Sequence, residues 1–305
     1  MLMKKDRFKA CILAGAIGDA WGSSYENEPL ARSATTYYWT APREPERVWA
    51  ITDDTQLSLA SCEAMQQPGV PTADALAACM LRFFRERRLT GIGASTLKAL
   101  QELAVGGHWS QVGRTGEYAA GNGAAMRIAP YAFHPLCSRE IVRDLCRITH
   151  RNDEAYTGAL AVVLAIRAVL SGDWNGQHSL FTLLIPQLPD TNLRDRLIQI
   201  NEMGSGITIT DVARLGTNGY VVNSVPLALF AASRVLETGM EGMLMEIINA
   251  GGDTDTNASI AGQVAGALVG TAGIPASLLH KLKTLPDYSW IRQVVDITAD
   301  TLFPA

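Results

Sequence analysis

The chain has 305 residues, 48% of them hydrophobic, and its 26 basic and 30 acidic residues give a net charge of −4. This length and composition suffice to bury a large core, which argues against the disordered and fibrous classes. The charge balance offers no electrostatic footprint for nucleic acid or for an anionic membrane, so we expect neither partner, and an anionic ligand must be held by local groups.

Helical periodicity dominates the chain, because apolar residues recur at three- and four-residue steps. The pattern predicts helices over residues 8–21, 55–65, 72–88, 94–103, 124–133, 139–149, 154–170, 193–203, 221–236, 240–250, 256–271, 276–283 and 290–302. Thr72 and Thr191 are expected to cap helix starts, and Gly172, Gly204 and Gly239 are expected to follow helix ends. Strand alternation is nearly absent, so we predict an all-α fold in one domain over residues 1–305.

Cysteine usage and hydropathy favour an intracellular chain. The five cysteines are scattered without CxxC spacing, which is typical of reduced core thiols. The N-terminus has no hydrophobic signal region ending in a cleavage site, so a cytoplasmic location is expected. The longest apolar stretch, residues 155–170, contains Arg167 and is shorter than the roughly 20 residues of a membrane span. We therefore predict that it forms a buried helix.

Two long segments between the predicted helices are candidates for function. One covers residues 22–51, contains Tyr37-Tyr38-Trp39 and ends at an acidic cluster. The other covers residues 105–123 and is rich in glycine. Long loops in a compact domain are more often functional than not.

The first acidic cluster is Thr52-Asp53-Asp54-Thr55, immediately before a predicted helix. Thr and Asp commonly cap such a start, because they accept hydrogen bonds from free backbone N–H groups. A cap alone does not require two adjacent acids, and a cation between them would relieve their mutual repulsion.

The second acidic cluster is residues 251–256, GGDTDT. Asp253 and Asp255 would not share a face of a regular helix, so their convergence requires an irregular turn, which the two glycines can form. Carboxylates and hydroxyls are the ligands of a hard cation such as Mg²⁺ or Mn²⁺, whereas zinc usually recruits Cys or His. The two clusters are therefore predicted to be halves of one metal site, with a turn and helix cap as the alternative.

The helix after the second cluster carries Gly262, Gly266 and Gly270 at four-residue spacing. Such a stripe allows another helix to approach closely, and we expect that helix to be residues 8–21. Its Asp19 is a charge that burial would penalise unless it is paired or hydrogen-bonded, and an exposed position is the alternative.

Gly121-Asn122-Gly123 precedes another predicted helix, where glycines let backbone N–H groups approach a phosphate. An ordinary turn is the alternative interpretation. His150 lies at a helix end, where histidines are most often caps or solvent-facing residues.

The types and order of these motifs resemble the ADP-ribosylglycohydrolase family, through nearly the whole chain. The resemblance rests on residues 15–22 with Gly18-Asp19-Ala20, Ser23-Ser24-Tyr25-Glu26, residues 52–55, residues 121–127, Thr149-His150, Asn223-Ser224-Val225-Pro226 and residues 251–256 with the small-residue helix that follows. It implies an all-α domain that holds two Mg²⁺ or Mn²⁺ ions in a central cleft.

The resemblance also implies roles for individual residues. The family's metal ligands map by motif onto Thr52, Asp53, Asp54, Asp253, Asp255 and Thr256. Glu26 lies where some members carry a glutamate implicated in catalysis. The segments that contact ADP-ribose map onto Gly121, Asn122, Gly123 and His150.

The implied activity is a metal-dependent hydrolase that removes ADP-ribose from a modified protein side chain, with arginine as the favoured acceptor. A water oriented by the metal would attack the anomeric carbon of the ribose, and Asp54 or Glu26 would position or deprotonate it. The expected partners are an ADP-ribosylated protein and the product ADP-ribose.

Three alternatives stay open at this stage. The enzyme could hydrolyse another ADP-ribose linkage, to serine or to a small molecule. A non-catalytic ADP-ribose binder would be expected to have lost its metal ligands. An all-α isoprenoid synthase would also bind Mg²⁺ through paired aspartates, but residues 53–57, DDTQL, lack the last acid of its DDxxD spacing. The oligomeric state is open.

Overall fold

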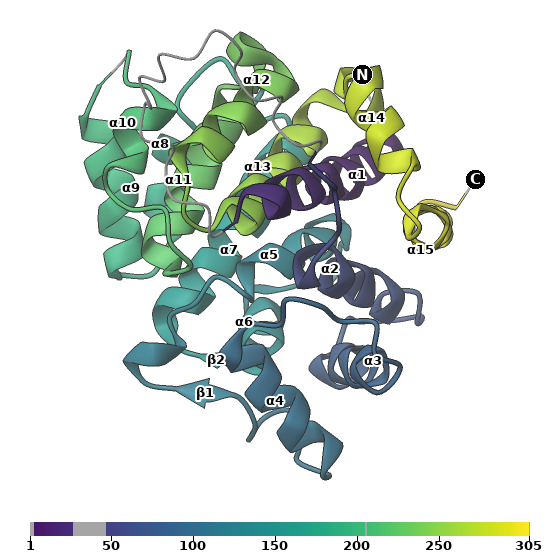
Figure 1. The fold of residues 1–305 in the computed structure, drawn as a ribbon. Coiled ribbons are helices and arrows are strands. Elements are labelled where there is room, and N and C mark those ends of the chain that lie inside the picture. The colour runs from purple at the N-terminus through teal and green to yellow at the C-terminus, as the bar shows by residue number, and fades with distance from the viewer. Residues whose placement is uncertain (1–2, 27–46, 205, 305) are drawn as a thin grey trace, which may run out of the picture.

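The computed structural model describes residues 3–26, 47–204 and 206–304. Within these ranges the chain is almost entirely helical (Figure 1). The α-helices are α1 (Lys4–Gly22), α2 (Asp53–Ala64), α3 (Ala73–Arg85), α4 (Ala94–Ala104), α5 (Ala125–Ile128), α6 (Arg139–Arg147), α7 (Asp153–Ser171), α8 (Leu180–Leu184), α9 (Asn192–Glu202), α10 (Ile209–Ala213), α11 (Val221–Ser233), α12 (Val235–Ala250), α13 (Thr254–Val269), α14 (Ala276–Lys283) and α15 (Tyr288–Leu302). The tripeptide Tyr37-Tyr38-Trp39 lies outside the described residues.

The predicted helices are all present, with differences where local residues interrupt the pattern. The segment 124–133 is short α5 followed by a 3₁₀ helix, because Pro130 cannot donate to the helical ladder. Gly239 adopts φ 70° inside α12 and breaks it into two helical parts. Two short helices, α8 and α10, were not predicted. The side chains of Thr72 and Thr191 cap α3 and α9 as expected.

Helices α1 and α13 lie side by side at the centre of the molecule (Figure 1). A Cβ added at Gly18 would lie 2.2 Å from the carbonyl oxygen of Ala258, and one added at Gly262 would lie 2.3 Å from that of Ala14. Only glycine permits this backbone approach, so the predicted pairing of the two helices is confirmed. Gly270 is not part of the stripe, because it ends α13 with φ 71°.

Helix α7 packs against α5, α6, α11 and α13. It is long and apolar enough to cross a membrane by length and composition, and 67% of its apolar window is buried inside the fold. The side chain of Arg167 donates to the carbonyl oxygens of Ala132 and Cys137. The prediction of a buried helix is confirmed.

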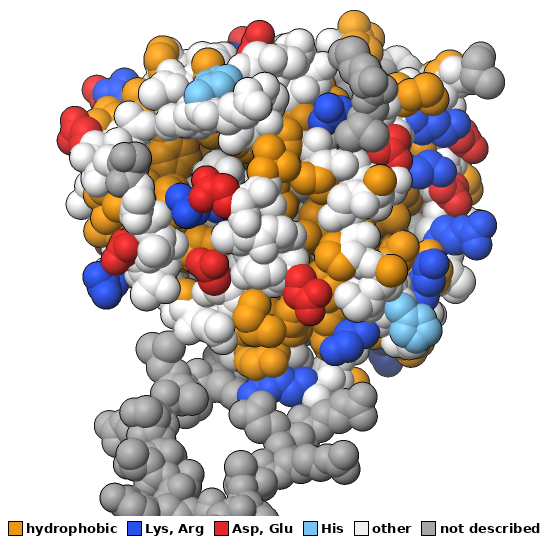
Figure 2. Space-filling model, turned by 90° about the horizontal axis from the view of Figure 1, so that it is seen from above, with side chains coloured by type: hydrophobic (Ala, Val, Ile, Leu, Met, Phe, Trp, Pro, Cys, Tyr) orange, Lys and Arg blue, Asp and Glu red, His pale blue; other side chains and the backbone are white. Residues whose placement is uncertain are grey.

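Two short strands, β1 (Arg114–Thr115) and β2 (His150–Arg151), pair in parallel, with Arg114 opposite His150. The pair joins the middle of the predicted loop 105–123 to the segment after α6. All five cysteines are buried and free, as predicted. On the face shown in Figure 2, acidic and basic side chains lie interspersed among polar and hydrophobic ones.

Candidate active site

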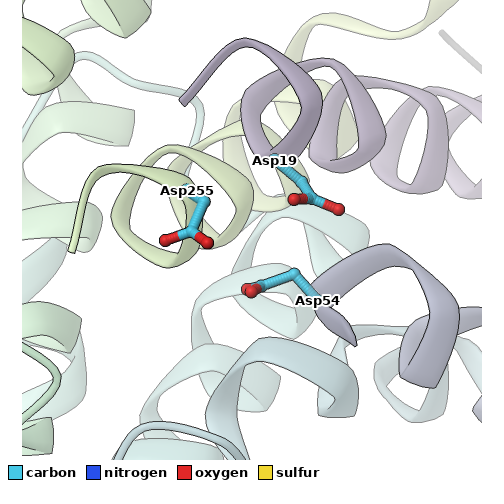
Figure 3. Close-up of side chains that lie close together, drawn as sticks. All are labelled: Asp19, Asp54 and Asp255. Atoms are coloured by element: carbon cyan, nitrogen blue, oxygen red, sulfur yellow. The ribbon is translucent and has the colours of Figure 1, made fainter. Parts of the chain in front are cut away.

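Three buried carboxylates from three different helices point toward one another (Figure 3). Asp19 comes from α1, Asp54 from the first turn of α2 and Asp255 from the first turn of α13. One oxygen of each lies within 4.8 Å of the others. The close backbone packing of α1 on α13 explains part of this convergence, since a Cβ at Gly22 would lie 2.5 Å from the carbonyl oxygen of Thr254.

A second group of carboxylates shares one member with the first. Oxygens of Glu26, Asp253 and Asp255 also lie within 4.8 Å of one another. Asp253 is half-buried, whereas Glu26 is exposed and follows the 3₁₀ turn Ser23–Tyr25 at the end of α1. The two predicted clusters therefore meet in space, with Asp255 between two groups of acids.

Asp19 is fully buried and hydrogen-bonded, which decides between the two sequence interpretations. Its carboxylate accepts the backbone N–H groups of Thr52 and Thr55, at 3.0 Å each. It also accepts both hydroxyls, at 2.7 Å from Thr52 and 2.5 Å from Thr55. Asp19 thus caps α2 from outside. The sequence prediction did not include it in the acidic group, although a lone acid in an apolar helix was a signal for it.

Among the described residues, one oxygen of Asp54 has no protein partner. Its Oδ2 accepts the hydroxyl of Thr256 at 3.1 Å and lies 3.3 Å from the hydroxyl oxygen of Thr52, but Oδ1 is buried without a hydrogen bond. Buried polar atoms are nearly always satisfied, so an orphaned carboxylate oxygen indicates a missing partner. Oxygen-only donors and an unsatisfied carboxylate fit a hard divalent cation.

The electrostatics of this region favour either protonation of the carboxyls or a bound positive charge. Burial, followed by neighbouring acids, raises the pKa of Asp54 and Asp53 well above the usual value. Burial outweighs the hydrogen bonds of Asp19 and raises its pKa to about 6, and burial and the charge of Asp255 raise the pKa of Asp253 to about 7. Ionising several such groups together is unfavourable unless a cation compensates them.

Asp53 occupies a different place from the other predicted ligands. It is buried and lies outside both groups of three carboxylates. Its carboxylate accepts the backbone N–H of Gly93, just before α4. It still lines the same cavity as Asp54 and Asp255.

Gly121-Asn122-Gly123, here called the 121–123 turn, lies beside the second acidic cluster. The Asn122 side chain donates from Nδ2 to Oδ2 of Asp253 at 2.6 Å. The backbone N–H of Asn122 donates to the carbonyl oxygen of Gly219 at 3.1 Å, in the segment before α11. The turn is thus fixed to a predicted metal ligand, and no sequence pattern predicted this contact.

His150 is buried directly beneath the 121–123 turn, rather than capping a helix or facing solvent. A Cβ added at Gly121 would lie 3.1 Å from Nε2 of His150, and one at Gly123 would lie 2.9 Å from its Cε1. The glycines therefore leave the space that the imidazole occupies. Burial, followed by Arg127 and Arg114, lowers the pKa of His150 to about 3, so the ring is neutral.

These residues line one cavity of about 280 Å³. Its acidic end is formed by Glu26, Asp53, Asp54, Asp253 and Asp255. Its donor end is formed by the 121–123 turn, His150 and the start of α4 at Gly93, Ala94, Ser95 and Thr96. Every catalytic and binding residue predicted from the motifs except Thr52 lines this cavity, and Thr52 supports Asp54 from behind.

The start of α4 was not predicted as part of the site. The first N–H groups of a helix have no partner within it, and they carry the positive end of the helix dipole. The start of α4 lines the cavity next to the 121–123 turn, since a Cβ added at Gly123 would lie 3.5 Å from Oγ1 of Thr96, and it gives the donor end a second source of anion-binding N–H groups. The glycines Gly91 and Gly93 before this helix were the available sequence signal.

Comparison with known proteins connects this geometry to a family. A model of the ADP-ribosylglycohydrolase family matches residues 2–304. ADP-ribosylhydrolase ARH3 of Homo sapiens is 25% identical, covering 89% of this chain and 87% of the relative. ADP-ribosylarginine hydrolase Tri1 of Pseudomonas putida is 28% identical over 91% of this chain and 74% of its own length. The ADP-ribosyl-[dinitrogen reductase] glycohydrolase of Rhodospirillum rubrum is 25% identical over 95% and 94%.

A solved structure described as an ADP-ribosylglycohydrolase-related protein complex has the same fold. It superposes with a TM-score of 0.73 and 27% identity, and the match covers 98% of this chain and 99% of that one. The similarity therefore extends over the whole chain and includes both ends of the cavity.

Proposed function

The chain belongs to the ADP-ribosylglycohydrolase family, and we propose that it removes ADP-ribose from an arginine side chain of a modified protein with the help of two divalent cations. The observation that carries this proposal is the polarity of the cavity. One end gathers carboxylates around an unsatisfied oxygen of Asp54, and the other presents N–H donors. ADP-ribose has matching parts, a ribose with hydroxyls and a diphosphate.

The acidic end has the oxygen ligands to hold the cations. The proposed ligands are the oxygens of Thr52, Asp53, Asp54, Asp253, Asp255 and Thr256. Two groups of carboxylates that share Asp255 support two ions rather than one. Retention of every ligand that the motif requires also argues against a non-catalytic relative, and family membership replaces the isoprenoid-synthase alternative.

The donor end fits the diphosphate. The 121–123 turn, His150 beneath it and the start of α4 beside it all line this end, and backbone N–H groups at a helix start are suited to bind a phosphate. A second cavity of about 540 Å³ is lined by Tyr118, Ala120 and Tyr220. Ala120 and Tyr220 directly precede and follow Gly121 and Gly219, which line the first cavity. Aromatic faces stack on planar bases, so we place the adenine between the two tyrosines.

Glu26 is the residue we assign to proton transfer. When bound, the divalent cations would supply Lewis acidity toward a water and the ribose hydroxyls. Glu26 lies beside Asp253 and Asp255, and burial and the charge of Asp255 raise its pKa, which strengthens its carboxylate as a base. It accepts a proton from the water as the water oxygen bonds to the anomeric carbon and the glycosidic C–N bond breaks. The leaving guanidine then takes up a proton.

Asp54 has a different role in this assignment. It is fully enclosed between Asp19, Asp255 and Thr256, so it is placed to hold a cation rather than to exchange protons with water. We therefore assign the base to Glu26 rather than to Asp54, a choice that the sequence left open. A relative named ADP-ribosylarginine hydrolase supports arginine over serine as the acceptor.

Release of ADP-ribose from arginine-linked and serine-linked protein substrates tests the proposal directly. Each substrate is incubated with Mg²⁺, with Mn²⁺ and with EDTA. We expect metal-dependent release from arginine, a greatly reduced kcat for Glu26→Gln with metal affinity little changed, and loss of metal binding for Asp54→Asn. Release from serine alone would refute the acceptor, and no release from any linkage would refute the hydrolase. Family membership and the buried free thiols also lead us to propose a cytoplasmic enzyme.

A further inference from the structure

The protonation of His150 is determined by the side chains behind it. Its Nδ1 lies 2.7 Å from the hydroxyl oxygen of Thr149, which is itself fully buried. The hydroxyl oxygen also lies 2.8 Å from Nη2 of Arg127. Three residues thus form one hydrogen-bonded chain, Arg127 to Thr149 to His150, that ends at the donor end of the cavity.

The direction of this chain follows from what each group can donate. A guanidinium only donates, so Arg127 gives its proton to the oxygen of Thr149. The hydroxyl proton of Thr149 then needs an acceptor, and among the described contacts of Thr149 that acceptor is Nδ1 of His150. An accepting Nδ1 carries no proton. The neutral imidazole must therefore carry its single proton on Nε2.

The free proton lies at the wall of the cavity. Nε2 lies 3.1 Å from a Cβ position at Gly121 and 3.4 Å from one at Gly123, so it faces the 121–123 turn. His150 lines the cavity together with these glycines, and among the described residues Nε2 has no hydrogen-bond partner. An Nε2–H at this place is a donor for a bound anion.

Arg127 is buried and donates hydrogen bonds to the groups around His150. It is 1% exposed, and it also donates to the carbonyl oxygens of Gly123 and Leu145. Among the described residues it makes no salt bridge. One buried guanidinium thus fixes both the 121–123 turn and Thr149, and its uncompensated charge attracts an anion bound on that turn.

We propose that Arg127 and Thr149 are positioning residues that hold His150 in its neutral Nε2–H form, so that the imidazole donates a hydrogen bond to the diphosphate of ADP-ribose. The identity of the ligand rests on the proposed function, whereas the tautomer does not. The low pKa of His150 agrees with this assignment, since a ring that stays neutral keeps the same donor throughout the physiological range.

The tautomer can be read in the wild-type protein by ¹⁵N NMR of labelled histidines, with Mg²⁺ present. The chain has five histidines, and His150→Gln identifies the signal of His150. The expected spectrum at neutral pH is that of a neutral ring protonated on Nε2. A ring protonated on Nδ1, or a charged ring, would overturn the proposal without any further variant.

Thr149→Val tests the role of the hydroxyl, because it keeps the shape of the side chain and removes the donor. We expect mixed tautomers at His150 and a roughly 3- to 10-fold weaker Kd for ADP-ribose by calorimetry, the worth of about one hydrogen bond. Thr149→Ser should restore both readings, which a merely structural defect at this position would not explain.

Thr157→Val is the matched control. Thr157 is also fully buried, but its hydroxyl donates only to the carbonyl oxygen of Asp153 within α7. Thr157→Val should change neither the tautomer of His150 nor the Kd for ADP-ribose. Wild-type tautomer and affinity in folded Thr149→Val would refute the positioning role. If the wild-type protein binds no ADP-ribose at all, the proposed function fails instead, and the tautomer result stands independently.

Discussion

The acidic end and the donor end of the cavity are built by opposite means. At the acidic end, carboxylates from α1, α2 and α13 are brought together although they repel one another, and Asp54 keeps an unsatisfied oxygen. At the donor end, hydrogen bonds hold the side chains in place: Asn122 is bonded to Asp253, and His150 to Thr149. The first end thus has an unsatisfied acceptor, whereas the second has unsatisfied donors.

This difference between the two ends predicts the orientation of the bound ligand. A molecule with an anionic part and a hydroxyl-rich part fits only one way, with its anion on the donor end and its hydroxyls toward the acidic end. It also separates two kinds of effect. Changes at the acidic end should alter metal binding and the stability of the metal-free protein, and changes at the donor end should alter ligand affinity.

Asp54→Asn should break the acidic end most severely. Outer residues of metal sites typically contribute 10- to 100-fold to affinity or activity, so loss of a direct ligand should lower both by more than about 100-fold. The same change removes a buried charge among acids, so the metal-free variant should melt at a higher temperature than the wild type at pH 8. Calorimetric metal titration and thermal melts in EDTA measure the two effects.

The informative result for Asp54→Asn is a lower metal affinity together with a higher melting temperature of the metal-free protein. Asp195→Asn, at an exposed position in the first turn of α9, is the control and should change neither quantity. An Asp54→Asn variant that binds Mg²⁺ or Mn²⁺ as the wild type does would show that the carboxylates are not a metal site.

Gly18→Ala should disturb the frame that brings the acidic end together. The new Cβ would lie 2.2 Å from a backbone oxygen of α13, which cannot move aside as a flexible side chain can. Forcing atoms into a packed core costs about 1–3 kcal/mol, measured as the free energy of unfolding in denaturant. Metal affinity should weaken as well, because Asp19 and Asp255 separate.

Gly242→Ala provides the comparison for that change. Gly242 lies within α12, where the nearest atom to an added Cβ is 3.5 Å away. Alanine should stabilise this helix by roughly 0.5–1 kcal/mol. Equal effects of the two alanines would mean that the contact between α1 and α13 is not tight.

Asn122→Ala should reveal whether the two ends act on one another. The residue belongs to the donor end but bonds a carboxylate of the acidic end. Metal affinity should fall about 10-fold, along with ADP-ribose affinity, because Asp253 loses the group that orients it. Asn201→Ala, on the surface, is the control. Unchanged metal affinity would make the two ends independent.

The pH dependence of stability should be smaller and confined to the metal-free protein. The pKa of Asp19 is raised to about 6 and that of Asp253 to about 7, from a usual value of 3.8. A carboxyl with a raised pKa binds its proton more tightly in the folded state, so stability falls as pH rises from about 4 to about 7. Thermal melts in EDTA should show this slope, and saturating Mn²⁺ should reduce it. A melting temperature that rises over this interval in EDTA would contradict the account.

The sequence predicted the helices well because their signals are local. Periodicity, the caps at Thr72 and Thr191 and the small-residue stripe each act over a few residues, and all appear in the fold. The short helices α8 and α10 were missed because one or two turns carry too little periodicity. The helix end expected at Gly239 is confirmed, because its φ of 70° divides α12 into two helical parts.

The sequence predicted which residue types form the site, but it predicted fewer of the hydrogen bonds between them. The two acidic clusters could be joined by ligand chemistry and by family resemblance. The remaining contacts join residues far apart in the sequence or depend on the direction of a side chain. They link Asp19 to Thr52 beside Asp54, Asn122 to Asp253, and Thr149 to His150. No local pattern encodes those contacts.

Diffraction from crystals grown with Mn²⁺ and ADP-ribose tests the central claim most directly, because manganese scatters anomalously and both ends of the cavity are seen at once. The account predicts manganese peaks bounded by Asp54 and Asp255, with the diphosphate on the 121–123 turn beside His150. Manganese elsewhere, or a diphosphate bound through the metal at the acidic end, would contradict it.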